Sequence, residues 1–129
     1  MVIRALSVTS LLVAVWGLTE DIFLGEKNKA GLVPFDNGDD MFYWLFYSRD
    51  TPSTDPLTIW LSGGPGCSSE LATFIENGPF YVNDDLTLRL NEHSWSNNAN
   101  LLYVDQPVGT GYSKAASPDH LKSTEEGIA

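Results

Sequence analysis

The 129-residue sequence has little positive charge, little histidine and a single cysteine. Its 7 basic residues against 17 acidic ones give a formal net charge of -10, which argues against nucleic acids and anionic membranes as partners. The two histidines, His93 and His120, lie among polar residues without the spacing of a metal site or a catalytic triad, so surface positions are predicted for both. Cys67 is either a free thiol or half of a disulfide whose partner is missing.

Long hydrophobic runs are also absent after residue 20, so no later segment is expected to span a membrane. At the N-terminus Arg4 precedes the apolar run 11–18, and Glu20 follows it. This order predicts a secretory signal peptide over residues 1–19, with a membrane anchor or a buried N-terminal helix as the alternatives. Residues 20–129 then form one modest domain, because 43% of the chain is hydrophobic and 12% aromatic, enough to bury a core.

The most informative segment reads Trp60-Leu-Ser-Gly-Gly-Pro-Gly-Cys-Ser-Ser69. So much glycine indicates a backbone that approaches a ligand closely or takes dihedral angles that side chains forbid. The segment joins an apolar run to a predicted helix, and N–H groups at such a turn favour negative charge. It lacks the Gly-Lys-Ser/Thr ending of a phosphate-binding P-loop. An anion, or the oxyanion that develops during acyl transfer, is therefore the expected occupant.

Several elements are predicted around this loop. Buried strands are expected at Met41–Tyr47 and at Leu57–Ser62, as neighbours, and another strand at Leu101–Val104. Ser68 or Ser69 caps a helix that ends at Gly78-Pro79 and presents Leu71, Phe74 and Ile75 on one face. Residues 28–40 are predicted to be a loop with a short strand at Leu32–Phe35, and residues 84–95 a hairpin or loop.

The chain has no nucleophile in a recognisable setting. No Gly-x-Ser-x-Gly elbow occurs, and Ser113 in Gly109-Thr-Gly-Tyr-Ser113 lies outside its glycines. Ser123-Thr-Glu-Glu126 matches a capping box, which announces a helix that cannot form before Ala129. The sequence is therefore predicted to be the N-terminal piece of a longer protein.

Three segments in order resemble the serine carboxypeptidases of the α/β-hydrolase fold. They are the glycine loop at 60–69, Phe74-Ile-Glu-Asn-Gly-Pro-Phe80, and Asp105-Gln-Pro-Val-Gly-Thr-Gly-Tyr-Ser113. The resemblance implies an α/β fold in which this chain supplies the first strands of the central sheet, the oxyanion loop and the helix after it. It also implies removal of C-terminal residues from peptides through an acyl-enzyme, without a cofactor or a metal, in a secreted, vacuolar or lysosomal enzyme.

The resemblance assigns roles to individual residues. The amide of Gly64 would donate one hydrogen bond to the oxyanion. Ser62, Gly63 and Glu76 would hold the free C-terminal carboxylate of a peptide, with Glu76 as a neutral acid, so that activity favours acidic pH. An exposed, solubilising role for Glu76 is the alternative. Cys67 would pair with a cysteine far downstream, where the Ser, Asp and His of the triad also lie.

Two positions leave alternatives open. The peptidases commonly carry Asn where this chain has Ser62, and relatives that transfer acyl groups from sugar esters also depart from Asn there. An acyltransferase is therefore a second hypothesis, and a non-catalytic secreted fragment that binds peptides or a partner is a third. Trp60 either lines the cleft beside residues 105–113 or packs in the core. The isolated chain is expected to be inactive, because it lacks the nucleophile. It is also expected to be marginally stable, because strand edges and Cys67 lack their partners.

Overall fold

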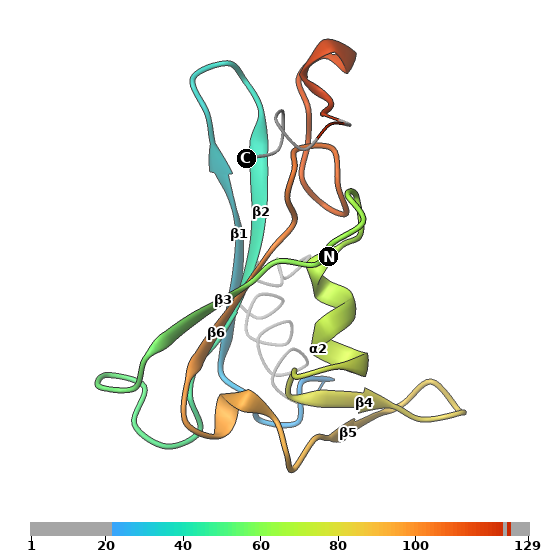
Figure 1. The fold of residues 1–129 in the computed structure, drawn as a ribbon. Coiled ribbons are helices and arrows are strands. Elements are labelled where there is room, and N and C mark those ends of the chain that lie inside the picture. Colours follow the sequence, from blue (N-terminus) through green and yellow to red (C-terminus); the bar gives the residue numbers. More distant parts are fainter. Residues whose placement is uncertain (1–21, 123, 125–129) are drawn as a thin grey trace, which may run out of the picture.

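The computed structural model describes residues 22–122 and 124. The predicted signal peptide and most of the predicted capping box lie outside these residues. Within them, a four-stranded sheet has the order β1-β2-β6-β3, and β4 and β5 form a separate hairpin (Figure 1). The strands are β1 (Asn28–Pro34), β2 (Asp40–Phe46), β3 (Leu57–Trp60), β4 (Phe80–Val82), β5 (Leu88–Leu90) and β6 (Asn100–Val104). The helical segments are η1 (Ser69–Leu71), α2 (Ala72–Ile75), η2 (Trp95–Asn97) and η3 (Pro118–His120).

The predicted strands are confirmed, but their neighbours and burial differ from expectation. β6 lies between β2 and β3, antiparallel to β2 and parallel to β3, so β2 and β3 are not neighbours. The helical crossover after β3 makes the parallel pairing possible. β3 is an edge strand among the described residues, and its Leu57 and Ile59 side chains are exposed rather than buried.

Two further expectations need correction. Residues 28–34, predicted mostly as loop, form β1, because pairing with the aromatic strand β2 outweighs their polar composition. The helix begins as predicted, with Ser68 as its cap accepting the Glu70 N–H, but it ends at Ile75. Its buried residues are Ala72 and Thr73, whereas Leu71 and Ile75 are exposed. The short helix thus buries its small residues, and it lies beside the four-stranded sheet (Figure 1).

The core lies between the sheet, α2 and β4. Its fully buried members are Phe46, Ala72, Phe80, Leu101 and Tyr103. Phe46 contacts Phe80 and Tyr103 edge to face, with ring centroids 5.6 and 6.1 Å apart, a geometry that adds about 0.5–1.5 kcal/mol per pair beyond burial. This aromatic cluster fixes α2, and with it the end of the glycine loop, against the sheet.

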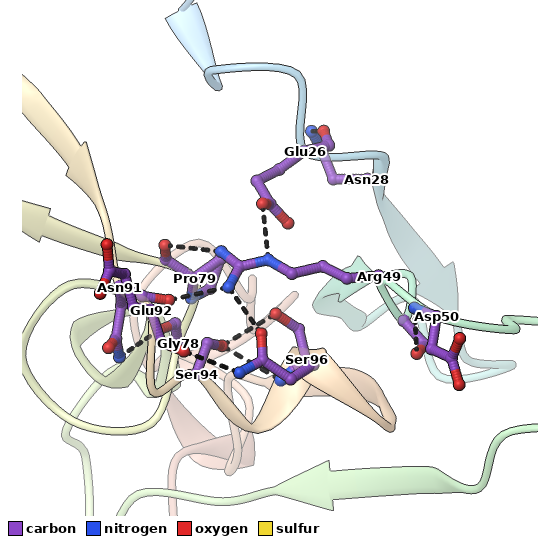
Figure 2. A network of polar contacts seen from close by, with 12 residues as sticks. Glu26, Asn28, Arg49, Asp50, Gly78, Pro79, Asn91, Glu92, Ser94 and Ser96 are labelled. Carbon is purple, nitrogen blue, oxygen red and sulfur yellow. Dashed lines mark hydrogen bonds and ion pairs between the residues drawn. The ribbon is translucent and has the colours of Figure 1, made fainter.

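Arg49, three residues after the end of β2, connects three segments of the chain (Figure 2). Its Nε donates to Glu26 Oε1 at 2.8 Å, and its Nη1 donates to the carbonyl of Asn91 and to Asn97 Oδ1, each at 2.8 Å. Its Nη2 reaches the carbonyl of Pro79 at 3.3 Å. The planar guanidinium suits this arrangement because its five donors have fixed directions. Arg49 thereby ties the β4–β5 hairpin to the sheet.

Replacing Arg49 with methionine is expected to lower the free energy of unfolding by about 2 kcal/mol. Four oxygen acceptors would lose their donor, among them the part-buried carbonyls of Pro79 and Asn91. Arg49→Lys should recover only part of this loss, since an ammonium cannot reach all four acceptors at once. Urea unfolding of the complete protein measures the stability of both variants. Equal stability of Arg49→Met and the unmodified protein would show that the network is not stabilising.

None of the described helices is long and apolar enough to cross a membrane. Among the same residues, no three His, Cys, Asp or Glu side chains gather closely enough to hold a metal ion.

Candidate functional site

The glycine loop leaves the carboxyl end of β3 and runs over residues 61–68 to η1. Gly64 and Gly66 have φ angles of +130° and +96°, which L side chains rarely adopt. Both glycines are exposed, and Cys67 N–H donates to the Gly63 carbonyl at 3.3 Å. The N–H groups of Gly63 and Gly64 donate to no described residue. Gly63 is exposed as well, so the loop offers two N–H groups without a partner among the described residues, and their binding of an anion stays a prediction.

Ser69 closes this loop. Its Oγ accepts the N–H of Ser62 at 3.0 Å and donates to the carbonyl of Val104 at 2.6 Å. One hydroxyl thus joins Ser62, near the start of the loop, to the end of β6. Ser69 itself is fully buried, and these two part-buried hydrogen bonds hold the loop's two ends together.

Asp105 holds Ser69 from the other side. Its carboxylate is fully buried and accepts the Ser69 N–H at 2.9 Å on Oδ1 and the Tyr112 N–H at 2.8 Å on Oδ2. Gly111 passes so close that a Cβ there would lie 2.0 Å from Asp105 Oδ2. Residues 105–113 therefore wrap around the carboxylate, and their end is secured by Ser113 Oγ, which donates to the Asp105 carbonyl at 2.6 Å.

Glu70 is a second buried carboxyl, next to Asp105. Its Oε2 lies 2.5 Å from Ser68 Oγ, while its Oε1 has no donor among the described residues. Burial, and secondly the adjacent Asp105 carboxyl, together raise the pKa of Glu70 to about 7, against a smaller lowering by the Ser68 hydroxyl group. Two carboxyls in one buried site do not both ionise readily.

Glu76 follows α2, where it caps the helix end and is exposed. Burial, and secondly the charge of Glu76, raise the pKa of Tyr103. Tyr103 is paired across the sheet with Trp60, two residues before Ser62. The Tyr103 hydroxyl donates to Asn77 Oδ1 at 3.1 Å, so the residue that follows Glu76 is attached to β6.

The remaining predicted positions are placed as follows. Ser62 is half-buried, and Cys67 is exposed and unpaired among the described residues. Trp60 is half-buried and meets Trp95 edge to face, with centroids 5.6 Å apart, beside the core cluster. Packing is therefore part of its role, and its place in a cleft stays a prediction.

Of the two histidines, His93 is exposed as predicted, but His120 is not a plain surface residue. Its Nδ1 lies 2.7 Å from Asp39 Oδ1, and this contact, followed by the N–H of Ala116, lowers the pKa of Asp39. The two residues are 81 positions apart in the sequence, so no local spacing could reveal the pair. They border a hollow of ≈ 570 Å³ whose other walls include Gln106, Pro107 and Val108.

Sequence reasoning missed the Glu70–Asp105 pair. The sequence pattern assigns no role to Glu70 and marks Asp105 only as the first residue of the segment 105–113. Their separation of 35 positions carries no local signal. A weak signal is the pair of glycines after Asp105, Gly109 and Gly111, because closely spaced glycines indicate a backbone that wraps closely around another group.

Comparison with known proteins places this arrangement in a family. The family model described as serine carboxypeptidase matches residues 18–129, most of the chain. The chain belongs to the serine carboxypeptidase family. It is 52% identical over 90 residues to serine carboxypeptidase S10 family member 1 of Dictyostelium discoideum, covering 70% of this chain and 22% of that protein. With serine carboxypeptidase-like 48 of Arabidopsis thaliana it shares 54% identity over 89 residues, covering 69% and 17%.

A solved structure of the family shows the same fold. The chain matches the crystal structure of a prohormone-processing carboxypeptidase from Saccharomyces cerevisiae with a TM-score of 0.63 and 38% identity, covering 79% of this chain and 23% of that one. The predicted partial α/β-hydrolase fold is thereby confirmed. The chain spans about a fifth of the length of the curated relatives it matches.

Proposed function

We propose that this chain carries the oxyanion-side half of a serine carboxypeptidase active site, which releases C-terminal residues from peptides through an acyl-enzyme. The observation that carries the proposal is the pair of free N–H groups at Gly63 and Gly64, on a loop whose φ of +130° at Gly64 only glycine adopts readily. Preorganised donors aimed at developing charge are the largest single contribution in acyl transfer. Family membership supports the reaction class.

In this proposal Gly64 donates to the oxyanion, while Ser62, Gly63 and Glu76 hold the substrate's free carboxylate. Glu76 is exposed, so its carboxyl is free to meet a peptide. It binds a carboxylate only in its protonated form, because two negative charges at hydrogen-bonding distance repel. Peptide cleavage is therefore favoured at acidic pH, which suits a vacuolar, lysosomal or secreted enzyme with a signal peptide at residues 1–19.

Substitution of Glu76 tests this role. Glu76→Ala should raise KM for a peptide with a free C-terminus by about 10- to 100-fold, the equivalent of one lost charge-assisted hydrogen bond of about 1.5–3 kcal/mol. Glu76→Gln keeps a neutral donor at every pH, so KM should vary less with pH than in the unmodified enzyme. Steady-state kinetics on the longest natural chain that contains these residues measures both. An unchanged KM in Glu76→Ala would remove Glu76 from the site, and a peptide with an amidated C-terminus is the control.

Residues 1–129 alone are proposed to be inactive, because the nucleophile and its base are not among them. The exposed apolar edge at Leu57 and Ile59 also favours a role as part of a larger sheet over a free-standing binding protein. Cys67, exposed and unpaired among the described residues, would pair with a downstream cysteine. Turnover of a blocked dipeptide by the purified 129-residue chain would contradict the inactivity.

A sugar-ester acyltransferase is the second candidate, favoured by Ser62. Its hydroxyl is shorter than the Asn side chain common in the peptidases and offers no amide donor. Assaying the complete protein on peptides and on sugar esters separates the two functions. Turnover of peptides alone would exclude the transferase.

A further inference from the structure

Glu70 and Asp105 form a buried carboxyl pair that the proposed reaction does not use. Asp105 is fully buried and Glu70 nearly so, and Asp105 Oδ1 accepts the N–H of Ser69, the residue directly before Glu70, at 2.9 Å. Neither carboxyl forms an ion pair with a cation among the described residues. Two adjacent buried carboxylates without a cation repel strongly, so the site needs either a counter-charge or a proton.

The hydrogen-bond inventory shows where the proton fits. Asp105 already accepts the N–H groups of Ser69 and Tyr112 on its two oxygens, which stabilises its ionised form. Glu70 accepts no backbone N–H on Oε1, and that buried oxygen has no donor. A proton on Glu70 converts the unsatisfied oxygen into a donor toward Asp105, so the pair carries one negative charge in total.

The pair is attached to the glycine loop through two residues, Ser69 and Ser68. Ser69 gives its N–H to Asp105 and uses its Oγ to hold the N–H of Ser62, at the start of the loop. Glu70 reaches the other end of the loop through Ser68 Oγ. Displacing either carboxyl would therefore move residues 62 and 68 together, with Gly64 between them.

We propose that Glu70 and Asp105 share one proton, and that the protonated pair positions the glycine loop, which makes both of them positioning residues for the Gly64 amide. The consequence for catalysis rests on the proposed function, whereas the shared proton and the loop's attachment do not. Deprotonation of the pair places two negative charges next to Ser69, and the repulsion between them loosens the glycine loop.

The neighbouring elements carry other titratable groups, and these must be distinguished from the pair. They are Cys67 on the loop, Glu76 after α2, Tyr103 on β6, and Tyr112 and Lys114 in and after the segment that wraps around Asp105. Asp105 is the one charged group that shifts the pKa of Glu70, while the charge of Glu76 acts on Tyr103. A titration near pH 7 that disappears with Glu70 therefore belongs to the pair.

The sign of the pH effect follows from the raised pKa of Glu70. Below pH 4.5 the folded and unfolded states both hold the proton, and between pH 4.5 and about 7 only the folded state does. The unfolding equilibrium constant should therefore increase with pH across this range, by up to about tenfold per pH unit, and level off above pH 7. The total change should be about 300-fold.

The experiment compares Glu70→Gln and Glu70→Ala in the longest natural chain that contains these residues. Glu70→Gln supplies a permanent donor to Asp105 and an acceptor for Ser68, so its unfolding constant should not vary from pH 4.5 to 7. Glu70→Ala lacks the donor, and hydrogen exchange at the Ser69 and Tyr112 amides should accelerate at least tenfold, with rescue in Glu70→Gln. A Glu70→Gln variant that keeps the pH dependence of the unmodified protein would overturn the proposal.

A carbon-13 NMR titration of the unmodified protein keeps the test independent of how the variants fold. The Glu70 carboxyl carbon should titrate near pH 7, and the Asp105 carboxyl carbon should respond in the same step. Titration of Glu70 near pH 4.5 overturns the shared proton, whatever the enzyme's activity. If Glu70 titrates near pH 7 and the complete protein cleaves no peptide, the proposed function fails and the shared proton stands.

Discussion

Replacing Gly64 with alanine is expected to lower kcat for peptide cleavage by about 10²–10³-fold, the usual effect of losing one oxyanion donor. A Cβ at residue 64 would lie 3.1 Å from the backbone nitrogen of Cys67 and 3.2 Å from its Sγ. The φ angle of +130° is also unfavourable for any L side chain. The loop must therefore shift, and the Gly64 N–H moves away from the place where negative charge develops.

Gly66→Ala is the matched control for this prediction. It introduces a similar backbone strain in the same loop, at a φ of +96°, but its Cβ would meet no atom within 4 Å. Its kcat should fall by less than tenfold. Steady-state kinetics at saturating peptide, on the longest natural chain that contains these residues, measures both variants. If Gly64→Ala keeps a kcat close to that of the unmodified enzyme, the Gly64 amide is not an oxyanion donor.

Replacing Gly78 with alanine is expected to destabilise the fold by more than about 3 kcal/mol, at the upper end of what overpacking does. An added Cβ would lie 2.2 Å from the Cα of Thr73 and 2.4 Å from its carbonyl oxygen. Neither side can move away easily. Gly78 donates to the carbonyl of Ala72 at 3.0 Å and accepts from Asn91 Nδ2 at 2.9 Å, while Thr73 is fully buried in α2.

Gly63→Ala provides the comparison for stability alone, because a Cβ there has no atom within 4 Å and the backbone needs no positive φ. Its unfolding midpoint in urea should stay close to that of the unmodified protein. Gly78→Ala should either unfold at much lower urea or fail to accumulate in soluble form. A soluble Gly78→Ala protein with an unchanged midpoint would refute the close approach of residues 73 and 78.

Strands with a strong side-chain pattern could be predicted from the sequence. Strand order, and strands that form only because a neighbour pairs with them, could not. Residues 41–47 are aromatic almost throughout, so β2 was foreseen, and the Ser68 cap announced the helix. The strand order could not be foreseen, because a local pattern says nothing about which strand lies next to which. The first half of β1 was missed for the same reason: a strand was predicted only from residue 32, and residues 28–31 are held by their register with β2.

At the site, the glycine loop was predictable because positive φ angles leave a mark in composition, namely glycine at residues 64 and 66. The contacts that hold the loop were not. The Asp105 carboxylate accepts hydrogen bonds from the N–H groups of Ser69 and Tyr112. In the sequence, Asp105 and Glu70 look like any surface carboxyls, and they are far apart. The roles of Ser62, Gly63, Gly64 and Glu76 remain predictions for the experiments above.

The insertion of β6 between β2 and β3 has a consequence for the order in which the molecule can fold. On a ribosome, residues 40–60 emerge well before residue 100, yet β2 and β3 have no hydrogen bonds to share until β6 arrives between them. Pairing over such sequence separations is slow, because loop-closure entropy is lost before contacts form. The glycine loop therefore acquires its shape only when Val104 and Asp105 reach Ser69, so that nascent chains shorter than this point carry an unformed anion site.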